Sequence, residues 1–243
     1  LDECLEAGIK DIILIISKKK SIIKDYFYRD NFYKRIIKRK KDKKILKVYK
    51  KIQKYKKKIK FIYQNEPRGT GDAVLKTKNL IKDKHFLMLL PDDLIIGNNC
   101  SKKIIAIHKK YKSSVMASMK VNKKNVSRWG IFKVKQHLSK NNFLIANVVE
   151  KPSVKSAPSN NAVIGRYILP KKIFNSLKNQ KKGKDGEIQL TDAMQALAQN
   201  SEMYSWTFRG KRYDIGTMKD WFQSHLELSS KSEFIAFLKY FTD

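Results

Sequence analysis

A run of mostly β-branched apolar residues, Ile9–Ile16, narrows the possible folds more than any other stretch of the chain. A helical segment ends near Ala7, and Gly8 suits the left-handed turn that follows a helix. Ser21 can begin the next helix. A nearly continuous β-branched run is typical of a parallel strand that is covered on both faces. The order helix, strand, helix therefore predicts a doubly wound α/β fold.

The rest of the chain continues this alternation over its 243 residues. We expect further strands at 61–63, 86–90, 114–121, 130–135, 143–149 and 162–169. We expect helices at 73–81, 102–111, 171–177, 188–200, 217–228 and 233–241. The clearest loop, 153–160, is too short to separate two domains. The predicted architecture is one domain over residues 1–243, α/β, with a doubly wound, mostly parallel mixed sheet.

Positive charge is concentrated in residues 34–60, which hold 16 Lys or Arg against one acidic residue, while the whole chain carries a net charge of +32. Apolar residues recur there at spacings of three and four, at Ile45, Tyr49, Ile52, Tyr55 and Ile59. This spacing predicts a basic amphipathic helical insertion rather than a disordered tail. Such a high positive charge suggests nucleic acid as an alternative partner. Because Lys, Ile and Asn are abundant together, we favour compositional drift and do not expect nucleic acid to be the partner.

The two cysteines, Cys4 and Cys100, lie far apart and away from any His-rich cluster. We therefore expect neither a disulfide nor a zinc site, and a reducing, cytoplasmic location. The longest apolar runs fall far short of the ~20 residues that a membrane span needs, so we expect no membrane association. The chain opens on Leu1 without a Met, which suggests an interior start.

Asp92 and Asp214 each come at the end of a predicted strand. Ligands of open α/β sheets gather at the carboxyl ends of strands, where an Asp can hold a metal over phosphates. An Asp in that place can also simply cap a turn. Mg²⁺ usually takes only one or two protein carboxylates, so two separated Asp residues are enough for a magnesium site.

Two other segments have the residue types of a phosphate or sugar site. Gly69-Thr70-Gly71 lies between a strand and a helix, where glycines let backbone approach a ligand, although the segment could be a simple turn. Gln64, just before it, offers both a donor and an acceptor, as a pyrimidine edge requires. Glu150-Lys151 ends a strand and could be a surface ion pair, or could hold sugar hydroxyls and a phosphate.

Five segments together resemble the bacterial UTP–glucose-1-phosphate uridylyltransferases. They are Val148–Pro152, Ala157–Asn160, Gly165–Leu169, Gly186–Ala193 and Gly210–Gly216. The number, order and spacing of these segments make the resemblance strong. It covers nearly the whole chain. The second and third segments favour this family over the related thymidylyl- and guanylyltransferases.

The resemblance implies an α/β nucleotidyltransferase that makes UDP-glucose and pyrophosphate from UTP and glucose 1-phosphate with Mg²⁺. Carried over by position, it implies that Gln64 and Gly69 meet the uracil and that Asp92 and Asp214 hold the metal. Asp92 and Lys151 would be the catalytic residues.

The sugar side is implied in the same way. Gly130, Glu150 and Gly165 would meet the glucose, Lys151 would bind its phosphate, and Glu187 would support the sugar site less directly. The basic segment corresponds to a family insertion involved in subunit contacts, so we expect a homo-oligomer of two or four subunits.

The chain departs from the family pattern in two places. The family usually has His where Asp72 stands and an aliphatic residue where Thr70 stands. Its opening strand and glycine-rich loop are expected before Leu1. The alternatives that stay open are a related enzyme with another nucleotide or sugar, such as a thymidylyltransferase, a basic nucleic-acid-binding protein, and an inactive fragment.

Overall fold

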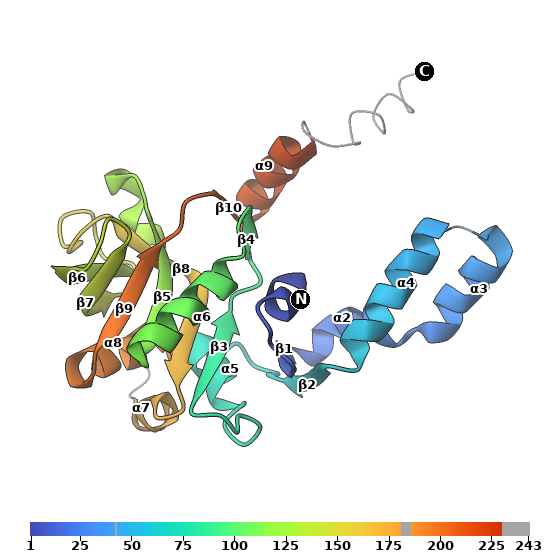
Figure 1. The fold of residues 1–243 in the computed structure, drawn as a ribbon, viewed down its shortest axis with the longest axis horizontal. Helices are drawn as coiled ribbons and strands as arrows, with labels where there is room; N and C mark the ends of the chain where they lie inside the picture. The colour runs from blue at the N-terminus through green and yellow to red at the C-terminus, as the bar shows by residue number, and fades with distance from the viewer. Residues whose placement is uncertain (42, 181–185, 230–243) are drawn as a thin grey trace. The chain divides into compact units, whose positions relative to one another are not determined.

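The computed structural model describes residues 1–41, 43–180 and 186–229 and separates them into two compact units (Figure 1). The first unit comprises Leu1–Lys84 and Pro170–Leu197, and the second comprises His85–Leu169 and the chain from Ala198 onward. No helix in the described part of the chain is long and apolar enough to cross a membrane.

The first unit is built on two parallel strands, β1 (Ile12–Ile16) and β2 (Ile59–Tyr63). Ile12 pairs with Ile59 and Ile16 with Tyr63, and the backbone N–H of Gln64 extends the pairing by donating to the Ile16 carbonyl at 2.9 Å. Three short helical segments flank β1, namely α1 (Asp2–Glu6), η1 (Lys18–Lys20) and α2 (Ile22–Tyr28). The predicted first strand is therefore present, starting at Ile12 rather than Ile9.

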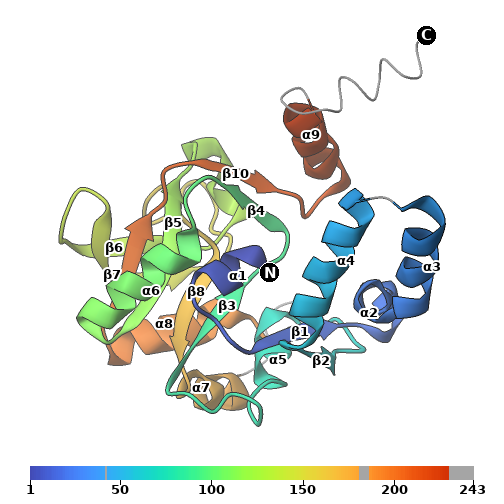
Figure 2. The same cartoon turned by 45° about the vertical axis from the view of Figure 1, so that its right-hand side comes forward.

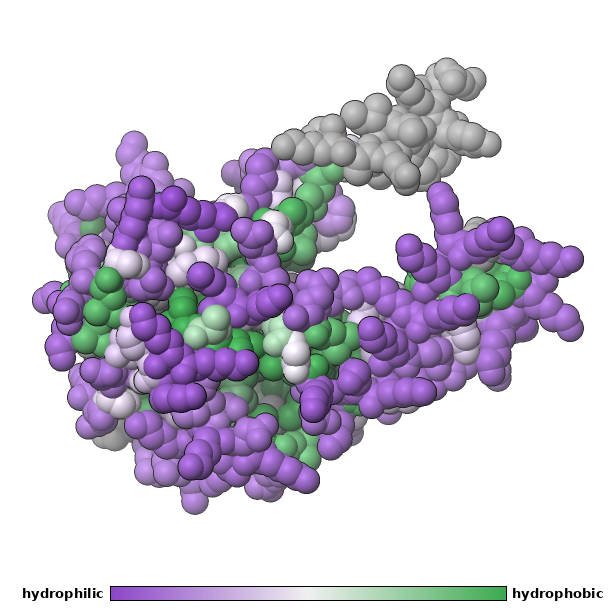
Figure 3. All heavy atoms as spheres, viewed as in Figure 1, coloured by the Kyte–Doolittle hydropathy of each residue, from purple (hydrophilic) through white to green (hydrophobic). Residues whose placement is uncertain are grey.

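The basic segment forms two helices, α3 (Asp30–Lys40) and α4 (Lys43–Lys56), rather than one. They lie side by side as a hairpin in both views (Figures 1 and 2). The first helix ends where Lys41 adopts a left-handed φ of 49°. Two buried residues, Ile52 and Tyr55, show that the predicted apolar stripe faces inward, while hydrophilic side chains surround the apolar atoms still visible on the hairpin (Figure 3).

Polar contacts fix the C-terminal half of α4. Asp30, at the start of α3, accepts hydrogen bonds from Lys56 and Gln53, both at 2.7 Å. The Lys56 hydrogen bond is the main cause that lowers the pKa of Asp30. Helix α4 ends at Lys56, and Ile59 and Lys60 belong to β2, so the strand begins two residues earlier than the sequence pattern predicts.

Three more helices complete the first unit: α5 (Thr70–Leu75), α7 (Ile173–Asn179) and the part of α8 (Leu190–Asn200) up to Leu197. Helix α5 begins three residues earlier and ends six residues earlier than predicted. The N–H of Gly71 donates to the Ile188 carbonyl at 2.8 Å, and Ile188 donates back to Arg68 at 2.9 Å. A Cβ on Gly71 would lie 2.6 Å from that carbonyl oxygen, so glycine permits this close backbone approach.

The second unit contains a six-stranded sheet with the order β3-β8-β5-β9-β7-β6. Its strands are β3 (His85–Leu89), β5 (Ser114–Lys120), β6 (Ile131–His137), β7 (Asn142–Val149), β8 (Asn161–Pro170) and β9 (Met203–Thr207). Strands β5 and β9 are parallel, whereas β5–β8, β6–β7 and β7–β9 are antiparallel. A separate antiparallel pair joins β4 (Asp93–Ile96) to β10 (Lys211–Asp214).

One helix, α6 (Cys100–Tyr111), covers a face of this sheet. The Asn99 side chain caps it by accepting from the Lys102 N–H at 2.8 Å. All ten residues of β8 are buried, as expected for a strand covered on both faces. The core formed here consists of Cys100, Ile104, Ile107, Val115, Ala117, Leu144, Ile164, Ile168, Tyr204 and Phe208.

The predicted α/β class is confirmed, and the sheet is mixed as expected, with a larger antiparallel share than the sequence indicated. The strand pattern did not predict β4 or β9. The second unit also holds η2 (Lys123–Arg128) and α9 (Met218–Ser229). The helix predicted at 233–241 lies outside the described residues. Cys4 and Cys100 are buried free thiols.

Ile104→Ala should lower the free energy of unfolding by about 2–5 kcal/mol, because Ile104 is fully buried between α6 and the sheet and the change leaves a cavity. Chemical denaturation measures the loss. The control Leu226→Ala, at a side chain that is 55% exposed, should change stability by less than about 0.5 kcal/mol. Equal effects of the two changes would contradict the assignment of this core.

Candidate active site

The two predicted metal ligands, Asp92 and Asp214, meet in the second unit. Strand β10 pairs with β4 so that Asp214 is opposite Asp93, and the Ile215 N–H donates to the Asp92 carbonyl at 2.8 Å. A Cβ on Gly216 would lie 3.2 Å from Asp214 Oδ1 and 3.3 Å from Asp92 Oδ2. One oxygen of each carboxylate thus borders the same small space beside Gly216.

This space suits a magnesium ion. The carboxylates supply two hard oxygen ligands, and Mg²⁺ commonly takes one or two from protein and the rest from water and phosphates. Among the described residues, no group of three or more His, Cys, Asp or Glu could hold a metal. A metal that needs three or four protein ligands is therefore a poorer match to the described part of the chain.

The other oxygen of Asp214 faces donors and cations. It accepts a hydrogen bond from the Trp129 indole at 3.0 Å, and the guanidinium groups of Arg128 and Arg212 lie 3.5 and 3.6 Å away. Both guanidinium groups also lie over the Trp129 ring, at 5.0 and 5.3 Å from its centre. These contacts hold the carboxylate in one orientation, with Oδ1 turned toward Gly216. A cavity of about 290 Å³ opens beside these residues.

Asp93, next to Asp92, is buried and does not face this space. One of its oxygens pairs with Arg212, and the other accepts a hydrogen bond from the Gly165 N–H at 2.6 Å. Burial raises the pKa of Asp93, and the charge of Arg212 opposes that shift. Asp93 therefore ties β8 to β10 and fixes the positions of the two neighbouring carboxylates.

Gly165, predicted to meet the sugar, lies at this junction in the buried strand β8. A Cβ on it would come within 2.6 Å of Leu90 Cβ and 2.8 Å of Asp93 Oδ2. Arg166 donates to the carbonyls of Leu90, Gly165 and Asp93 at 3.0–3.2 Å. The packing around Asp93 therefore explains the glycine, and its contact with a sugar stays a prediction.

Gly130, Glu150 and Lys151 lie together at the adjacent ends of β6 and β7. Ile131 pairs with Val149, and the Lys151 N–H donates to the Trp129 carbonyl at 3.1 Å. Lys151 is exposed and has a φ of +41°, a left-handed conformation that costs a non-glycine residue energy. Unusual backbone geometry of this kind is concentrated at functional sites. The structure thus links the predicted sugar residues, through Trp129, to Asp214.

Gln64, Gly69 and Glu187 belong to the first unit. The Gln64 amide donates to the Gly69 carbonyl at 3.1 Å and to Asp72 Oδ2 at 2.7 Å. Gly69 has a φ of +91°, and a Cβ there would lie 3.0 Å from Glu187 Cβ. Glu187 accepts a hydrogen bond from Gln189 at 2.7 Å. The two predicted uracil residues are thus in contact, and Glu187 lies beside them in the same unit.

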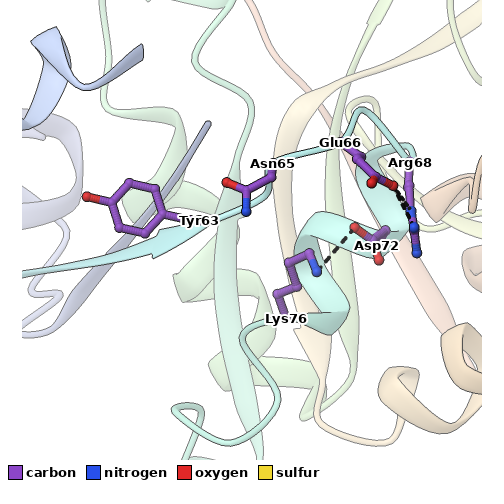
Figure 4. Close-up of a pocket in the computed structure, with 6 residues that line it drawn as sticks. All are labelled: Tyr63, Asn65, Glu66, Arg68, Asp72 and Lys76. Atoms are coloured by element: carbon purple, nitrogen blue, oxygen red, sulfur yellow. Dashed lines mark hydrogen bonds and ion pairs between the residues drawn. The ribbon is translucent and has the colours of Figure 1, made fainter. Parts of the chain in front are cut away.

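A pocket of about 200 Å³ lies next to this group, with Asp72, Lys76, Arg68 and Glu66 on its wall (Figure 4). Lys76 is 3.8 Å from the Asp72 carboxylate, and Arg68 pairs with Glu66 at 2.5 Å. The Asp72 side chain is only 12% exposed, whereas Lys76 is 38% exposed. The pocket wall therefore has one nearly buried carboxylate, Asp72, and two more exposed cations, Lys76 and Arg68.

Sequence reasoning missed four residues that hold these sites together: Asp72, Asp93, Trp129 and Arg212. Arg212 lies within the segment Gly210–Gly216, and Trp129 directly precedes Gly130. Their positions beside predicted site residues were therefore a signal in the sequence. Asp93 could not be told from Asp92 without the strand pairing. Asp72 was noted only as a departure from the family pattern.

The comparisons with known proteins agree with this geometry. A family model described as nucleotidyl transferase matches residues 1–231. The UTP–glucose-1-phosphate uridylyltransferase of Bacillus subtilis is 34% identical over 96% of this chain and 80% of its own length.

Two solved structures are also similar. One is a UTP-bound UGPase from Acinetobacter baumannii, 29% identical with a TM-score of 0.85, over 100% of this chain and 85% of that one. The other is a UDP-glucose pyrophosphorylase complexed with UDP-glucose, 31% identical with a TM-score of 0.83, over 95% and 85%. The chain belongs to the nucleotidyl transferase family and, within it, to the UTP–glucose-1-phosphate uridylyltransferases.

Asp93→Asn should lower the free energy of unfolding by about 3 kcal/mol, because it leaves the buried Arg212 guanidinium without its closest counter-charge. The double variant Asp93→Asn with Arg212→Met should recover part of that loss, which a double-mutant cycle of denaturation curves measures. The control Asp83→Asn, at an exposed position, should be near neutral. Additive effects of the two changes would contradict the coupling.

Proposed function

We propose that the protein transfers a uridylyl group from UTP to α-D-glucose 1-phosphate, giving UDP-glucose and pyrophosphate, as the names of its relatives indicate. The convergence of Asp92 and Asp214 beside Gly216 is the observation that supports this most directly. An oxygen of the sugar phosphate forms a bond to the α-phosphorus of UTP, and the bond from that phosphorus to the β-phosphate oxygen breaks. No proton has to be removed, because a phosphate is already a nucleophile.

The residues of the second unit would neutralise and position the reacting groups. Asp92 and Asp214 would hold Mg²⁺, which when bound offsets negative charge on phosphate oxygens. Lys151 would bind the phosphate of the sugar, which its exposed position beside Trp129 allows. Gly130, Glu150 and Gly165 would border the glucose, with the Glu150 carboxylate accepting hydrogen bonds from hydroxyls. Such positioning supplies most of the rate enhancement in reactions of this type.

The residues of the first unit would recognise the base. Gln64 follows β2 directly and is fixed by its backbone and side-chain hydrogen bonds, so it can present its amide to a pyrimidine edge. Gly69 would let the loop backbone approach the base, and Glu187, beside it, would support the sugar less directly.

A cytoplasmic location and a homo-oligomer of two or four subunits remain predictions from the sequence. Exposed apolar side chains on and beside the α3–α4 hairpin, Ile22, Tyr26, Phe32 and Val48, support a subunit contact there. Light scattering of the purified protein tests the oligomer, and a monomer at micromolar concentration would contradict it.

Asp92→Asn or Asp214→Asn should lower turnover by about 10²-fold or more at saturating Mg²⁺, because each removes a ligand of the metal. The affinity for Mn²⁺, measured by electron paramagnetic resonance without substrate, should fall as well. Asp83→Asn, which makes the same change at an exposed site, should leave both unchanged. Normal metal affinity in either variant would remove that residue from the site.

Lys151→Ala should raise the KM for glucose 1-phosphate and slow turnover, since a charge-assisted contact is worth about 1.5–3 kcal/mol. Lys151→Gly is the matched variant: it removes the same ammonium but suits the positive φ. The two variants should lose activity equally while the glycine variant is the more stable. Lys151→Arg should not restore full activity, because a planar fork differs from a compact ammonium. Unchanged sugar-phosphate kinetics in both truncations would make Lys151 an ordinary surface lysine.

A further inference from the structure

The Gln64 side chain can lie in only one of its two amide orientations. Its nitrogen is 3.1 Å from the Gly69 carbonyl and 2.7 Å from Asp72 Oδ2. Both neighbours are oxygen atoms that accept hydrogen bonds, one in a backbone carbonyl and one in a carboxylate. Turning the amide around would place its oxygen against these two oxygens. The two N–H groups of Gln64 are therefore both used inside the protein.

This leaves the Gln64 carbonyl oxygen as the group available to a ligand. No hydrogen bond to that oxygen from another described residue is seen, and the side chain is half-buried. A glutamine amide can either donate or accept a hydrogen bond, so the sequence alone leaves the role of Gln64 open. In this protein its two N–H groups donate to Gly69 and Asp72, so toward a ligand Gln64 can only accept.

Asp72 contributes the stronger of the two constraints. Its carboxylate makes the shorter contact, and a hydrogen bond to a charged acceptor is stronger than one to a neutral carbonyl. Burial strengthens it further, because the Asp72 side chain is only 12% exposed to water. Lys76 at 3.8 Å stands one helical turn away and partly balances the charge.

We infer that Asp72 is a specificity-determining residue, which locks Gln64 as a hydrogen-bond acceptor and so selects a base with an imide N–H. Uracil and thymine carry a hydrogen on N3 and can donate it to the Gln64 oxygen. Cytosine has a bare, electron-rich N3 that would face that oxygen without a hydrogen between them. A site that offers a fixed acceptor rejects a partner that lacks the donor, because the polar groups are then left unpaired. The inference rests on the proposed placing of Gln64 at the base.

The test compares the affinities of the protein for UDP-glucose, dTDP-glucose and CDP-glucose by titration calorimetry. The glucose and the diphosphate are the same in all three. UDP-glucose and CDP-glucose differ only in the base, so their ratio isolates it, whereas dTDP-glucose also lacks the ribose 2′-hydroxyl and serves only for the change of its ratio between variants. In Asp72→Asn the new asparagine amide can donate a hydrogen bond to the Gln64 oxygen. The Gln64 amide can therefore turn around. The preference for UDP-glucose over CDP-glucose should then fall by about tenfold or more. The preference for UDP-glucose over dTDP-glucose should change less than about twofold, because both bases carry the N3 hydrogen.

Three controls separate this effect from others. Lys76→Met keeps the carboxylate but removes its ion pair, so the uracil-to-cytosine ratio should stay as in the unmodified protein. Asp83→Asn makes the same chemical change at an exposed position and should alter no ratio. Asp72→Leu, which is similar in size and apolar, offers a second route if the asparagine variant does not fold. It removes the acceptor, so it should lower the same ratio.

Gln64→Ala separates a failure of the proposed base site from a failure of the proposed role of Asp72. If it leaves the affinity for UDP-glucose unchanged, the proposed placing of Gln64 at the base is wrong. If it weakens that affinity while both folded Asp72 variants keep the uracil-to-cytosine ratio within about twofold, the base site stands and the role of Asp72 is overturned. Equal affinity of the unmodified protein for UDP-glucose and CDP-glucose would overturn it as well.

Discussion

The buried carboxylate of Asp93 is the contact around which the second unit's site is built. One oxygen pairs with Arg212 on β10 and the other accepts the Gly165 N–H from β8, so a single side chain joins two strands that are far apart in sequence. Taking an aspartate out of water costs several kcal/mol, which a close counter-charge and a backbone N–H offset only in good geometry. Because that geometry is demanding, it leaves Asp92 and Asp214 little freedom, and their oxygens meet beside Gly216.

The glycines of the site follow from the same demand for close packing. Gly165 has no room for a Cβ against Leu90 and Asp93, and Gly71 has none against the Ile188 carbonyl. Both were singled out for chemistry, yet Gly71 lets backbone approach backbone, and Gly165 lets the side chains of Leu90 and Asp93 pack against β8. Gly216 differs from them, because the space over its α-carbon is bordered by one oxygen from each of two carboxylates, Asp92 and Asp214. Only this last gap has the character of a ligand site.

The sequence predicts secondary structure best where local residue preferences determine it. The strand patterns at 114–121, 143–149 and 162–169 match β5, β7 and β8 to within one residue at each end, because these strands are long and strongly apolar. It failed for β4, which is four residues long and owes its pairing to β10 over a hundred residues later. The single predicted basic helix is a hairpin of two helices, and no glycine marks the break, because Lys41 itself adopts the left-handed conformation that ends α3.

The sequence by itself determined which chemical groups the protein has and, through its motifs, the family and reaction that they resemble. It placed Asp92, Asp214, Gln64 and Lys151 next to turns at strand ends, because strand and turn preferences act over a few residues. Tertiary structure alone decided which of two adjacent aspartates faces the space beside Gly216, since successive residues of an extended chain point to opposite sides and only the partner strand fixes the register. It also decided which way the Gln64 amide lies, because its nitrogen donates to Asp72 and the position of that carboxylate depends on the fold.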